Sequence, residues 1–263
     1  MSEAIPVSVF SPLAGIISGK SKLPPRILIY GTEKIGKSSL AACAPKPIFI
    51  QTEDGLGQID CDKFPLSLSF SEVQRNLETL LTQANPYETI VIDSADWLER
   101  LIYDRVCEGP PFVATIELAA GGYGKGYTAA LAYWREILSM LDAAREKGII
   151  TILIAHAIVE KFDDPEQVSY DRYSPKLHKK TSGPLVLEWA DAVLFATRKM
   201  RVEKHDAGPK KRAVAQPIGK SGGDRVLRCV GSPACIAGNR YGMPDEIPLT
   251  WDAVIEAITN GGN

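Results

Sequence analysis

The sequence has no paired-cysteine motif, no long apolar run and no large excess of charge of one sign. Its five cysteines are scattered and none stands in a CxxC pair, which excludes a disulfide-rich scaffold and is typical of reduced thiols. No apolar stretch reaches the ~18 residues that span a bilayer. The first residues also lack the basic stretch and apolar core of a signal peptide. We therefore expect a soluble, cytoplasmic protein that does not contact a membrane.

Net charge alone argues against a nucleic-acid partner, but the distribution of charge does not. The 263 residues carry 30 Lys or Arg against 32 Asp or Glu, a formal charge of −2. Residues 172–212 hold eleven basic and four acidic residues, an excess of seven positive charges, so the rest of the chain carries −9. A concentrated basic stretch can follow the phosphates of a nucleic-acid strand.

Apolar runs rich in Ile and Val alternate with segments of helical periodicity. The runs lie at 26–30, 47–51, 89–93, 149–155 and 192–196. Such runs predict strands buried on both faces of a parallel sheet. Helices are predicted at 71–83, with a capping box at Ser71 and Gln74, at 128–147 and at 251–259. The predicted fold class is therefore α/β, with a mostly parallel central sheet flanked by helices.

Consecutive prolines and shorter apolar runs mark the two ends of this core. Segments 213–218 and 225–230 are interpreted as antiparallel strands added at the sheet edge. Two consecutive prolines at 24–25 mark a boundary before the first strand. We expect an N-terminal extension at 1–25, which can contact a neighbouring subunit, and one domain at 26–263.

A phosphate-binding loop follows the first predicted strand and opens a helix. Residues 31–38 read GTEKIGKS and match GxxxxGK[ST]. Its glycines let backbone N–H groups turn toward an anion, Lys37 can reach the β- and γ-phosphates, and the Ser38 hydroxyl can bind Mg²⁺. ATP and Mg²⁺ are the expected ligands. The predicted nucleotide-binding residues are Gly31, Thr32, Glu33, Lys34, Ile35, Gly36, Lys37, Ser38, Ser39 and Asp93, with Ser38 and Asp93 at the metal.

Polar residues at the carboxyl ends of other predicted strands complete the candidate site, because ligands of such sheets bind at that edge. Asp93 ends one strand and can hold Mg²⁺ through water. Glu53 follows the strand at 47–51 and can orient the attacking water, with Asp54 as the competing candidate. His156 follows the strand at 149–155 and can sense the γ-phosphate, although a lone histidine is also a common structural residue.

Together these segments resemble the RecA-like ATPases. The resemblance implies a RecA-like P-loop NTPase core with antiparallel edge strands, and it makes 26–263 a RecA-like ATPase domain. More narrowly, the segments resemble the phage single-strand annealing and recombination proteins of the Sak four type, which are phage nucleotide-binding proteins of AAA type. The resemblance extends over about residues 22–258. It rests on the phosphate loop and on FIQTED (49–54), IVIDS (90–94), GYGKGY (122–127), ILIAH (152–156), LEWADAVLFA (187–196) and GNRYGMPDEIPLTWD (238–252).

The resemblance implies a DNA-dependent ATPase that binds single-stranded DNA and promotes annealing or strand exchange in homologous recombination. It implies a filament or ring of identical subunits, a single-strand DNA-binding protein as a further partner, and the host cytoplasm as location. It assigns water activation to Glu53 and γ-phosphate sensing to His156, beside Lys37. It assigns Arg240 to the ATP of a neighbouring subunit, with Gly238 where a second basic residue is common. Glu33 and Lys34 replace the usual Pro and Gly of the loop.

Two DNA-binding loops are implied by the same resemblance, at 107–126 and 157–183. The residues expected to contact DNA are Tyr123, Lys125, Tyr127, Arg172, Lys176, Lys179 and Lys180. Tyr170 and Tyr173 offer further faces on which bases can stack.

Two other functions are compatible with the phosphate loop. A small-molecule P-loop kinase normally needs an Arg-rich lid and an acceptor pocket, and the basic stretch at 172–212 can be mistaken for such a lid. A nucleotide-switched loader or scaffold would bind ATP and hydrolyse little of it, which the unusual Glu33 and Lys34 leave open. An AAA+ machine is disfavoured, because no segment has the pattern of a separate helical lid domain.

Overall fold

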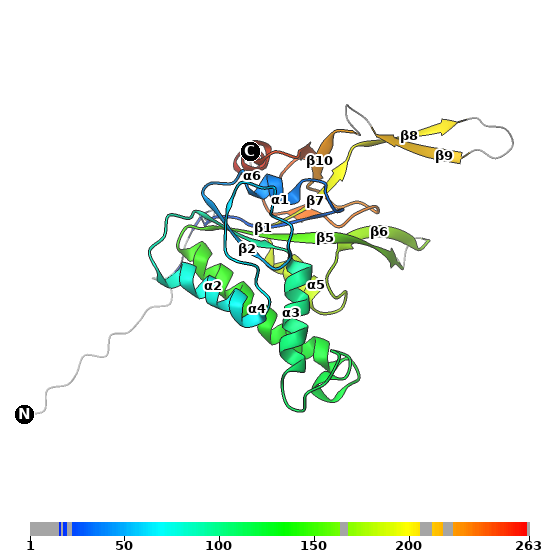
Figure 1. Ribbon diagram of the computed structural model, residues 1–263. Coiled ribbons are helices and arrows are strands. Elements are labelled where there is room, and N and C mark those ends of the chain that lie inside the picture. The colour runs from blue at the N-terminus through cyan, green and yellow to red at the C-terminus, as the bar shows by residue number, and fades with distance from the viewer. Residues whose placement is uncertain are drawn as a thin grey trace, which may run out of the picture.

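The apolar runs of the sequence form the centre of a ten-stranded sheet in a computed structural model of the protein (Figure 1). The structure describes residues 16, 18–19, 23–163, 168–205, 212–217 and 223–261, and side chains within 200–222 are not described. Residues 1–15 of the predicted N-terminal extension therefore lie outside the described residues, and a role for them stays a prediction.

The central strands are parallel and lie in the order β7-β1-β5-β4-β2. They are β1 (Arg26–Gly31), β2 (Pro47–Gln51), β4 (Thr89–Asp93), β5 (Ile150–Phe162) and β7 (Ala192–Arg198). Each begins within one residue of its predicted position, and their central residues are buried on both faces. The predicted fold class, α/β with a mostly parallel sheet, is thereby confirmed.

Shorter strands extend both sides of the parallel centre. The short β3 (Asp62–Lys63) pairs with β2. On the other side β10 (Arg225–Arg228) runs antiparallel to β7, and β12 (Glu246–Pro248) pairs with β10, while β11 (Gly238–Asn239) pairs with the start of β7. The antiparallel edge predicted at 225–230 is thus confirmed.

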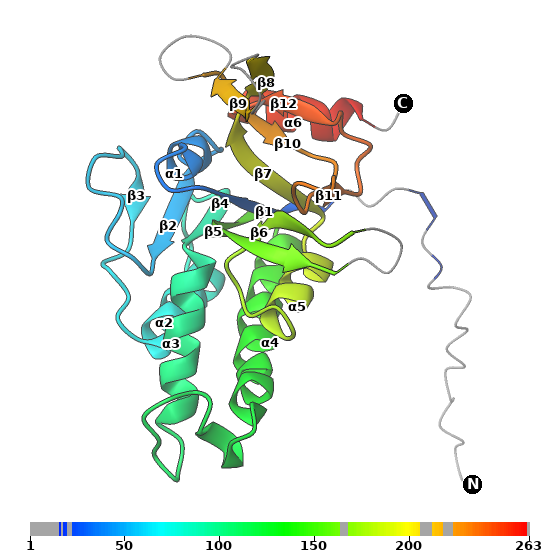
Figure 2. The ribbon, with the colours of Figure 1, turned by 90° about the vertical axis from the view of Figure 1, so that its right-hand side faces the viewer.

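Helices cover the two faces of the sheet (Figure 2). One face carries α2 (Phe70–Thr82), α3 (Ala95–Cys107), α4 (Lys125–Glu146) and α5 (Ser182–Trp189), and a 3₁₀ turn, η2 (Ala119–Gly121), precedes α4. The other face carries α1 (Lys37–Ala41) and α6 (Trp251–Asn260). Two apolar cores fill the layers, one with the fully buried Trp134 of α4 and the other with Leu40 of α1 and Val254 of α6.

The start of α2 differs from the prediction by two residues. Ser69, and not Ser71, is the N-cap, and its hydroxyl accepts from the Glu72 backbone N–H at 3.3 Å. The Glu72 carboxylate accepts from the Leu68 backbone N–H at 2.6 Å. The capping pair Ser69 and Glu72 has the same three-residue spacing as Ser71 and Gln74, and the burial of Phe70 selects it.

Two predictions about the second half of the chain were wrong. The segment predicted at 213–218 does not join the main sheet: β9 (Arg212–Pro217) pairs with β8 (Met200–His205) in a separate two-stranded sheet that projects from the body (Figure 1). Most of the loop predicted at 157–183 is ordered secondary structure, because β5 continues to Phe162 and turns back as β6 (Tyr170–Pro175). The described chain after β7 contains strands and α6, with no separate helical lid domain.

Candidate functional site

Strand register brings the predicted site residues to one edge of the sheet. Gly31 at the end of β1 lies opposite His156 of β5, and Asp93 of β4 lies opposite Gln51 of β2, two residues before Glu53. These are the carboxyl ends of parallel strands, where ligands of open α/β sheets bind. The phosphate loop and its predicted partners are therefore neighbours in space.

The phosphate loop turns sharply between β1 and α1. Both Lys34, with φ of 58°, and Gly36, with φ of 109°, have positive φ angles. Glycine adopts such a conformation without strain, which suits position 36. Ile35 between these two residues is buried, whereas the side chains of Thr32, Glu33 and Lys34 are exposed. The unusual Glu33 and Lys34 therefore face solvent, and the turn that a phosphate loop needs is present.

Gly31 has no room for a side chain. A Cβ atom built there would lie 2.3 Å from the carbonyl oxygen of Ala196, the residue opposite it on β7. Glycine at this position lets β1 end close against β7, directly before the phosphate loop.

Lys37 is held inside the loop. Its ammonium group donates to the carbonyl oxygens of Gly31 and Thr32, both at 2.9 Å, and the residue is only 6% exposed. Burial lowers the Lys37 pKa, against the attraction of Asp93 and Asp96. An ammonium has three protons, so two contacts within the described chain leave one for a phosphate oxygen.

The Ser38 hydroxyl donates to the Asp93 carboxylate at 2.6 Å. Burial raises the Asp93 pKa, and neither the bond from Ser38 nor the Lys37 charge offsets it. A buried carboxylate with one hydroxyl partner is stabilised in its charged form by a cation. Among the described residues no three His, Cys, Asp or Glu side chains form a metal site by themselves. This donor set fits Mg²⁺ that takes its other ligands from phosphate oxygens and water.

Glu53 lies beside His156 at this edge of the sheet. Glu53 Oε1 is 3.8 Å from His156 Nε2, and the two side chains are 22% and 17% exposed. Burial raises the Glu53 pKa despite the opposing effect of His156. Asp54, the competing candidate, is exposed. The structure therefore separates the two carboxylates: Glu53 faces the site and Asp54 faces solvent.

Asp96 is a site residue that the sequence reasoning missed. It lies on the first turn of α3 and is 4% exposed. Its carboxylate accepts from the His156 backbone N–H at 3.0 Å and contacts the His156 ring Nδ1 at 3.0 and 3.1 Å. An acidic residue in a first helical turn is ordinary, so the sequence alone did not distinguish it.

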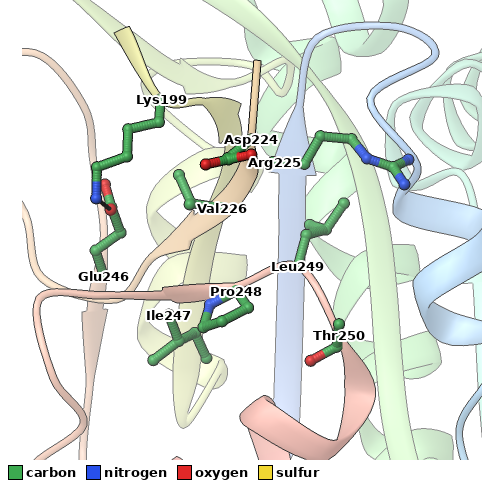
Figure 3. Close-up of a pocket in the computed structure, with 9 residues that line it drawn as sticks. All are labelled: Lys199, Asp224, Arg225, Val226, Glu246, Ile247, Pro248, Leu249 and Thr250. Carbon is green, nitrogen blue, oxygen red and sulfur yellow. Dashed lines mark hydrogen bonds and ion pairs between the residues drawn. The ribbon is translucent and has the colours of Figure 1, made fainter. Parts of the chain in front are cut away.

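Arg225 is a second missed residue, on β10. Its guanidinium donates to the Ile35 carbonyl oxygen at 3.2 Å, and Figure 3 shows the side chain reaching from β10 toward the phosphate loop. Arg225 borders two pockets, one of about 560 Å³ between β10 and β12 and one of about 280 Å³ beside α1. The smaller pocket is lined by residues that include Gly36, Cys43 and Thr250.

Arg240 lies at the opposite edge of the sheet. It donates to the Asp191 carboxylate at 2.9 Å and to the Glu188 carbonyl oxygen at 2.9 Å, and its side chain is 59% exposed. Asp191 precedes β7 and contacts Arg26 at the start of β1. Five residue steps along β1 span about 16 Å, so Arg240 is remote from the phosphate loop of its own chain.

The predicted aromatic DNA contacts fall into two kinds. Tyr123 is 99% exposed, in the turn before α4. Tyr127 is fixed instead: its hydroxyl donates to Glu117 at 2.6 Å and its ring stacks on His178 with centroids 4.0 Å apart. Lys125 and Tyr127 belong to α4, so the loop predicted at 107–126 ends earlier than expected.

The basic residues predicted to contact DNA also differ in their exposure. Lys176, Lys179 and Lys180 are exposed after β6. Arg172 is directed inward, with its guanidinium 3.8 Å from the centre of the Phe162 ring. Tyr170 packs near Phe162, and Tyr173 stacks on Phe195. Lys210 and Lys211 lie outside the described residues, as do the side chains of Arg201, Lys204 and Arg212. Among the described residues of the basic stretch that are predicted to contact DNA, Lys176, Lys179 and Lys180 are therefore the exposed ones.

The phosphate loop on a parallel sheet, with a serine and an aspartate paired at the expected metal position, defines a P-loop NTPase. The chain matches the AAA_24 family, described as an AAA domain, over residues 23–241 and belongs to that family. It is 26% identical over 193 residues to the SPbeta prophage-derived uncharacterized protein YorG of Bacillus subtilis (strain 168). That alignment covers 72% of this chain and 55% of YorG, so the chain spans about half the length of this curated relative. The chain is therefore a P-loop protein of the AAA_24 family, and the relative YorG is prophage-derived.

Two further expectations concern the cysteines and membrane-spanning helices. All five cysteines are free thiols, as predicted. No helix within the described ranges is long and apolar enough to cross a membrane.

Proposed function

We propose that this protein is a RecA-type ATPase that hydrolyses ATP in response to single-stranded DNA and promotes annealing or strand exchange. The observation that carries the proposal is the position of Glu53. Glu53 follows β2 by two residues, and its carboxylate lies 3.8 Å from His156 of β5, at the sheet edge that also carries the Ser38–Asp93 pair. A glutamate after the second strand, combined with a polar residue on the sensor strand, is the arrangement that the RecA-like resemblance implies.

In this proposal the residues of one subunit have separate roles in ATP hydrolysis. The phosphate loop and Lys37 bind the β- and γ-phosphates, and Ser38 and, through water, Asp93 hold Mg²⁺, which neutralises charge on the phosphate oxygens when bound. Glu53 orients the attacking water, and His156 Nε2 contacts the γ-phosphate side. The pocket of about 280 Å³ beside α1 gives the nucleoside room next to the loop.

A second subunit completes the site in this proposal. Arg240 is exposed and remote from its own phosphate loop, so it is placed to act on the ATP of a neighbour. An arginine supplied in trans stabilises charge in the transition state. A contact between two different faces of identical subunits builds a ring or a filament.

Single-stranded DNA is the proposed partner because exposed cations and an exposed aromatic ring occur on the predicted DNA-binding segments. Lys176, Lys179 and Lys180 can neutralise phosphates, and Tyr123 offers a stacking face. Kinship with a prophage-derived protein is consistent with a role in phage DNA metabolism.

The test is ATP turnover by the full chain with and without single-stranded DNA. We expect DNA to stimulate turnover and Lys37→Ala to abolish it. An ATP turnover rate that does not change when single-stranded DNA is added would contradict the DNA-dependent part of the proposal. Tight ATP binding with negligible turnover on any DNA would identify a nucleotide-switched loader, and a phosphorylated small molecule in a metabolite screen would identify a kinase.

A further inference from the structure

We propose that Asp96 is a positioning residue that acts through His156. It keeps a proton on Nδ1 of the ring and thereby directs Nε2 toward Glu53 and the γ-phosphate side of the site. The inference deepens the proposed function, since it rests on the roles given there to Glu53 and His156.

Asp96 holds the backbone and the side chain of His156 at once. Its Oδ1 accepts from the His156 backbone N–H at 3.0 Å, and both of its oxygens lie 3.0 to 3.1 Å from the ring Nδ1. The Asp96 side chain is 3% exposed, so these contacts are shielded from water. One carboxylate therefore fixes the imidazole relative to the backbone of β5 at His156.

The chemistry of the two groups determines where the proton lies. Although burial pushes the Asp96 pKa upward, the hydrogen bonds from His156 outweigh it and keep that pKa below its usual range. Asp96 is therefore a carboxylate, which can only accept hydrogen bonds, so Nδ1 must be the donor. The partner of one ring nitrogen sets the role of the other.

Nε2 is then the nitrogen available to the site. It lies 3.8 Å from Glu53 Oε1, too far for a direct hydrogen bond but within reach through a water or a phosphate oxygen. The hydrogen bond to Asp96 raises the His156 pKa despite burial, the charges of Asp96 and Glu53 act in the same direction, and Lys37 opposes them. In its neutral form Nε2 accepts a hydrogen bond, and in its charged form it donates one.

Glu99 supplies a matched control on the same helix. It lies one turn after Asp96 and is also buried, at 7% exposed. Its carboxylate accepts from the His178 backbone N–H at 3.1 Å and from the Ser182 hydroxyl. Because these partners lie outside the phosphate site, Glu99→Gln removes a buried carboxylate from α3 without touching His156.

The experiment measures the His156 tautomer and ATP turnover together. ¹⁵N spectra of histidine-labelled full-length protein report which ring nitrogen carries the proton, and His156→Gln identifies the signals of His156. We expect the Nδ1–H form of the neutral ring in the wild type. Asp96→Asn should lower the His156 pKa, mix the two tautomers and reduce turnover about tenfold. Glu99→Gln should change neither the tautomer nor turnover by more than about twofold.

A double variant distinguishes positioning from a separate role. If Asp96 acts through His156, then Asp96→Asn combined with His156→Gln turns over ATP no more slowly than His156→Gln alone. If adding Asp96→Asn to His156→Gln lowers ATP turnover by the same factor as Asp96→Asn does in the wild type, the proposal is overturned. An Nε2–H neutral ring of His156 in the wild-type protein would also overturn it. Normal turnover by His156→Gln would instead remove the proposed sensor role of His156 and, with it, the effect of Asp96 on catalysis. The tautomer measurement would still test the contact between Asp96 and the His156 ring.

Discussion

The Arg240 guanidinium donates to the Asp191 carboxylate at 2.9 Å, at the amino ends of β1 and β7. Asp191 is 5% exposed and also contacts Arg26 at 2.9 Å and Arg145 at 3.3 Å. One buried carboxylate therefore organises three arginines at the edge of the sheet opposite the phosphate loop. Arg26 and Arg145 are largely covered, whereas Arg240 is exposed.

Asp191 should be important for stability, and its effect should depend on pH. Replacing it with Asn removes the buried charge that Arg26 and Arg145 share and leaves Arg26 with only the half-exposed Asp142 as a partner, and we expect a loss of about 3 kcal/mol in the free energy of unfolding at pH 7. Burial raises the Asp191 pKa, but the hydrogen bonds and charge of Arg26 outweigh it, so the folded pKa lies below the unfolded one.

The sign of the pH effect follows from that depressed pKa. The Asp191 contribution is complete above the unfolded pKa of about 3.9 and is lost as pH falls through the folded value. Denaturant unfolding of wild type and Asp191→Asn should therefore give curves that converge below about pH 4. Asp142→Asn is the control, because Asp142 is 44% exposed and its ion pair with Arg26 is worth less than about 1 kcal/mol. Equal losses for both variants would contradict this account.

Arg240 should act on a neighbouring subunit. We expect Arg240→Ala to fold, because Arg26 and Arg145 still neutralise Asp191, and to lose turnover by about 10³-fold. Mixing Arg240→Ala with Lys37→Ala should restore activity at the interfaces that join an intact Arg240 to an intact phosphate loop. The measurement is turnover across a range of mixing ratios. A mixture no more active than its components would argue against action in trans.

Gly31 should not tolerate a methyl group. Gly31→Ala places a Cβ atom 2.3 Å from the Ala196 carbonyl oxygen, so β1 and β7 must separate where the phosphate loop begins. We expect a loss of about 1–3 kcal/mol in the free energy of unfolding, together with weaker ATP binding. Gly55→Ala is the control, since nothing lies within 4 Å of a Cβ atom there. Thermal unfolding and ATP titration of the two variants check the prediction, which fails if they behave alike.

Arg225 should support ATP binding more than the chemical step. Its hydrogen bond to the Ile35 carbonyl oxygen braces the phosphate loop from β10. Arg225→Ala should weaken ATP binding about fivefold, since a net hydrogen bond is worth about 1 kcal/mol, with kcat little changed. Steady-state kinetics separate the two effects. A drop in kcat at unchanged KM would instead place Arg225 among the groups that act in the transition state.

Local patterns predicted the central sheet well because a strand buried on both faces is an unbroken apolar run. Ala157 to Phe162 could not be predicted in this way: the run ends at Ala155, and β5 continues past His156 because β6 pairs with it. The register of α2 depended on which serine, Ser69 or Ser71, lets Phe70 pack, which is a tertiary effect.

The candidate site was predictable where a residue stands at a strand end, and it was not where a partner comes from a distant segment. Asp93, Glu53 and His156 follow apolar runs and could be found by position. Asp96 meets His156 across sixty positions of sequence, and Arg225 meets Ile35 across 190. Contacts of that kind are created by the crossover of the chain and have no local signal.

Comparing Glu53→Gln with Asp54→Asn in ATP turnover tests the central claim most directly. Both substitutions remove one carboxylate charge after β2, but only Glu53 faces His156, whereas Asp54 is exposed. We predict that Glu53→Gln binds ATP and loses turnover by about 100-fold or more, as expected for removal of a group that orients the water, while Asp54→Asn stays close to wild type. Normal turnover by Glu53→Gln, or an equal loss in Asp54→Asn, would contradict the assignment of Glu53.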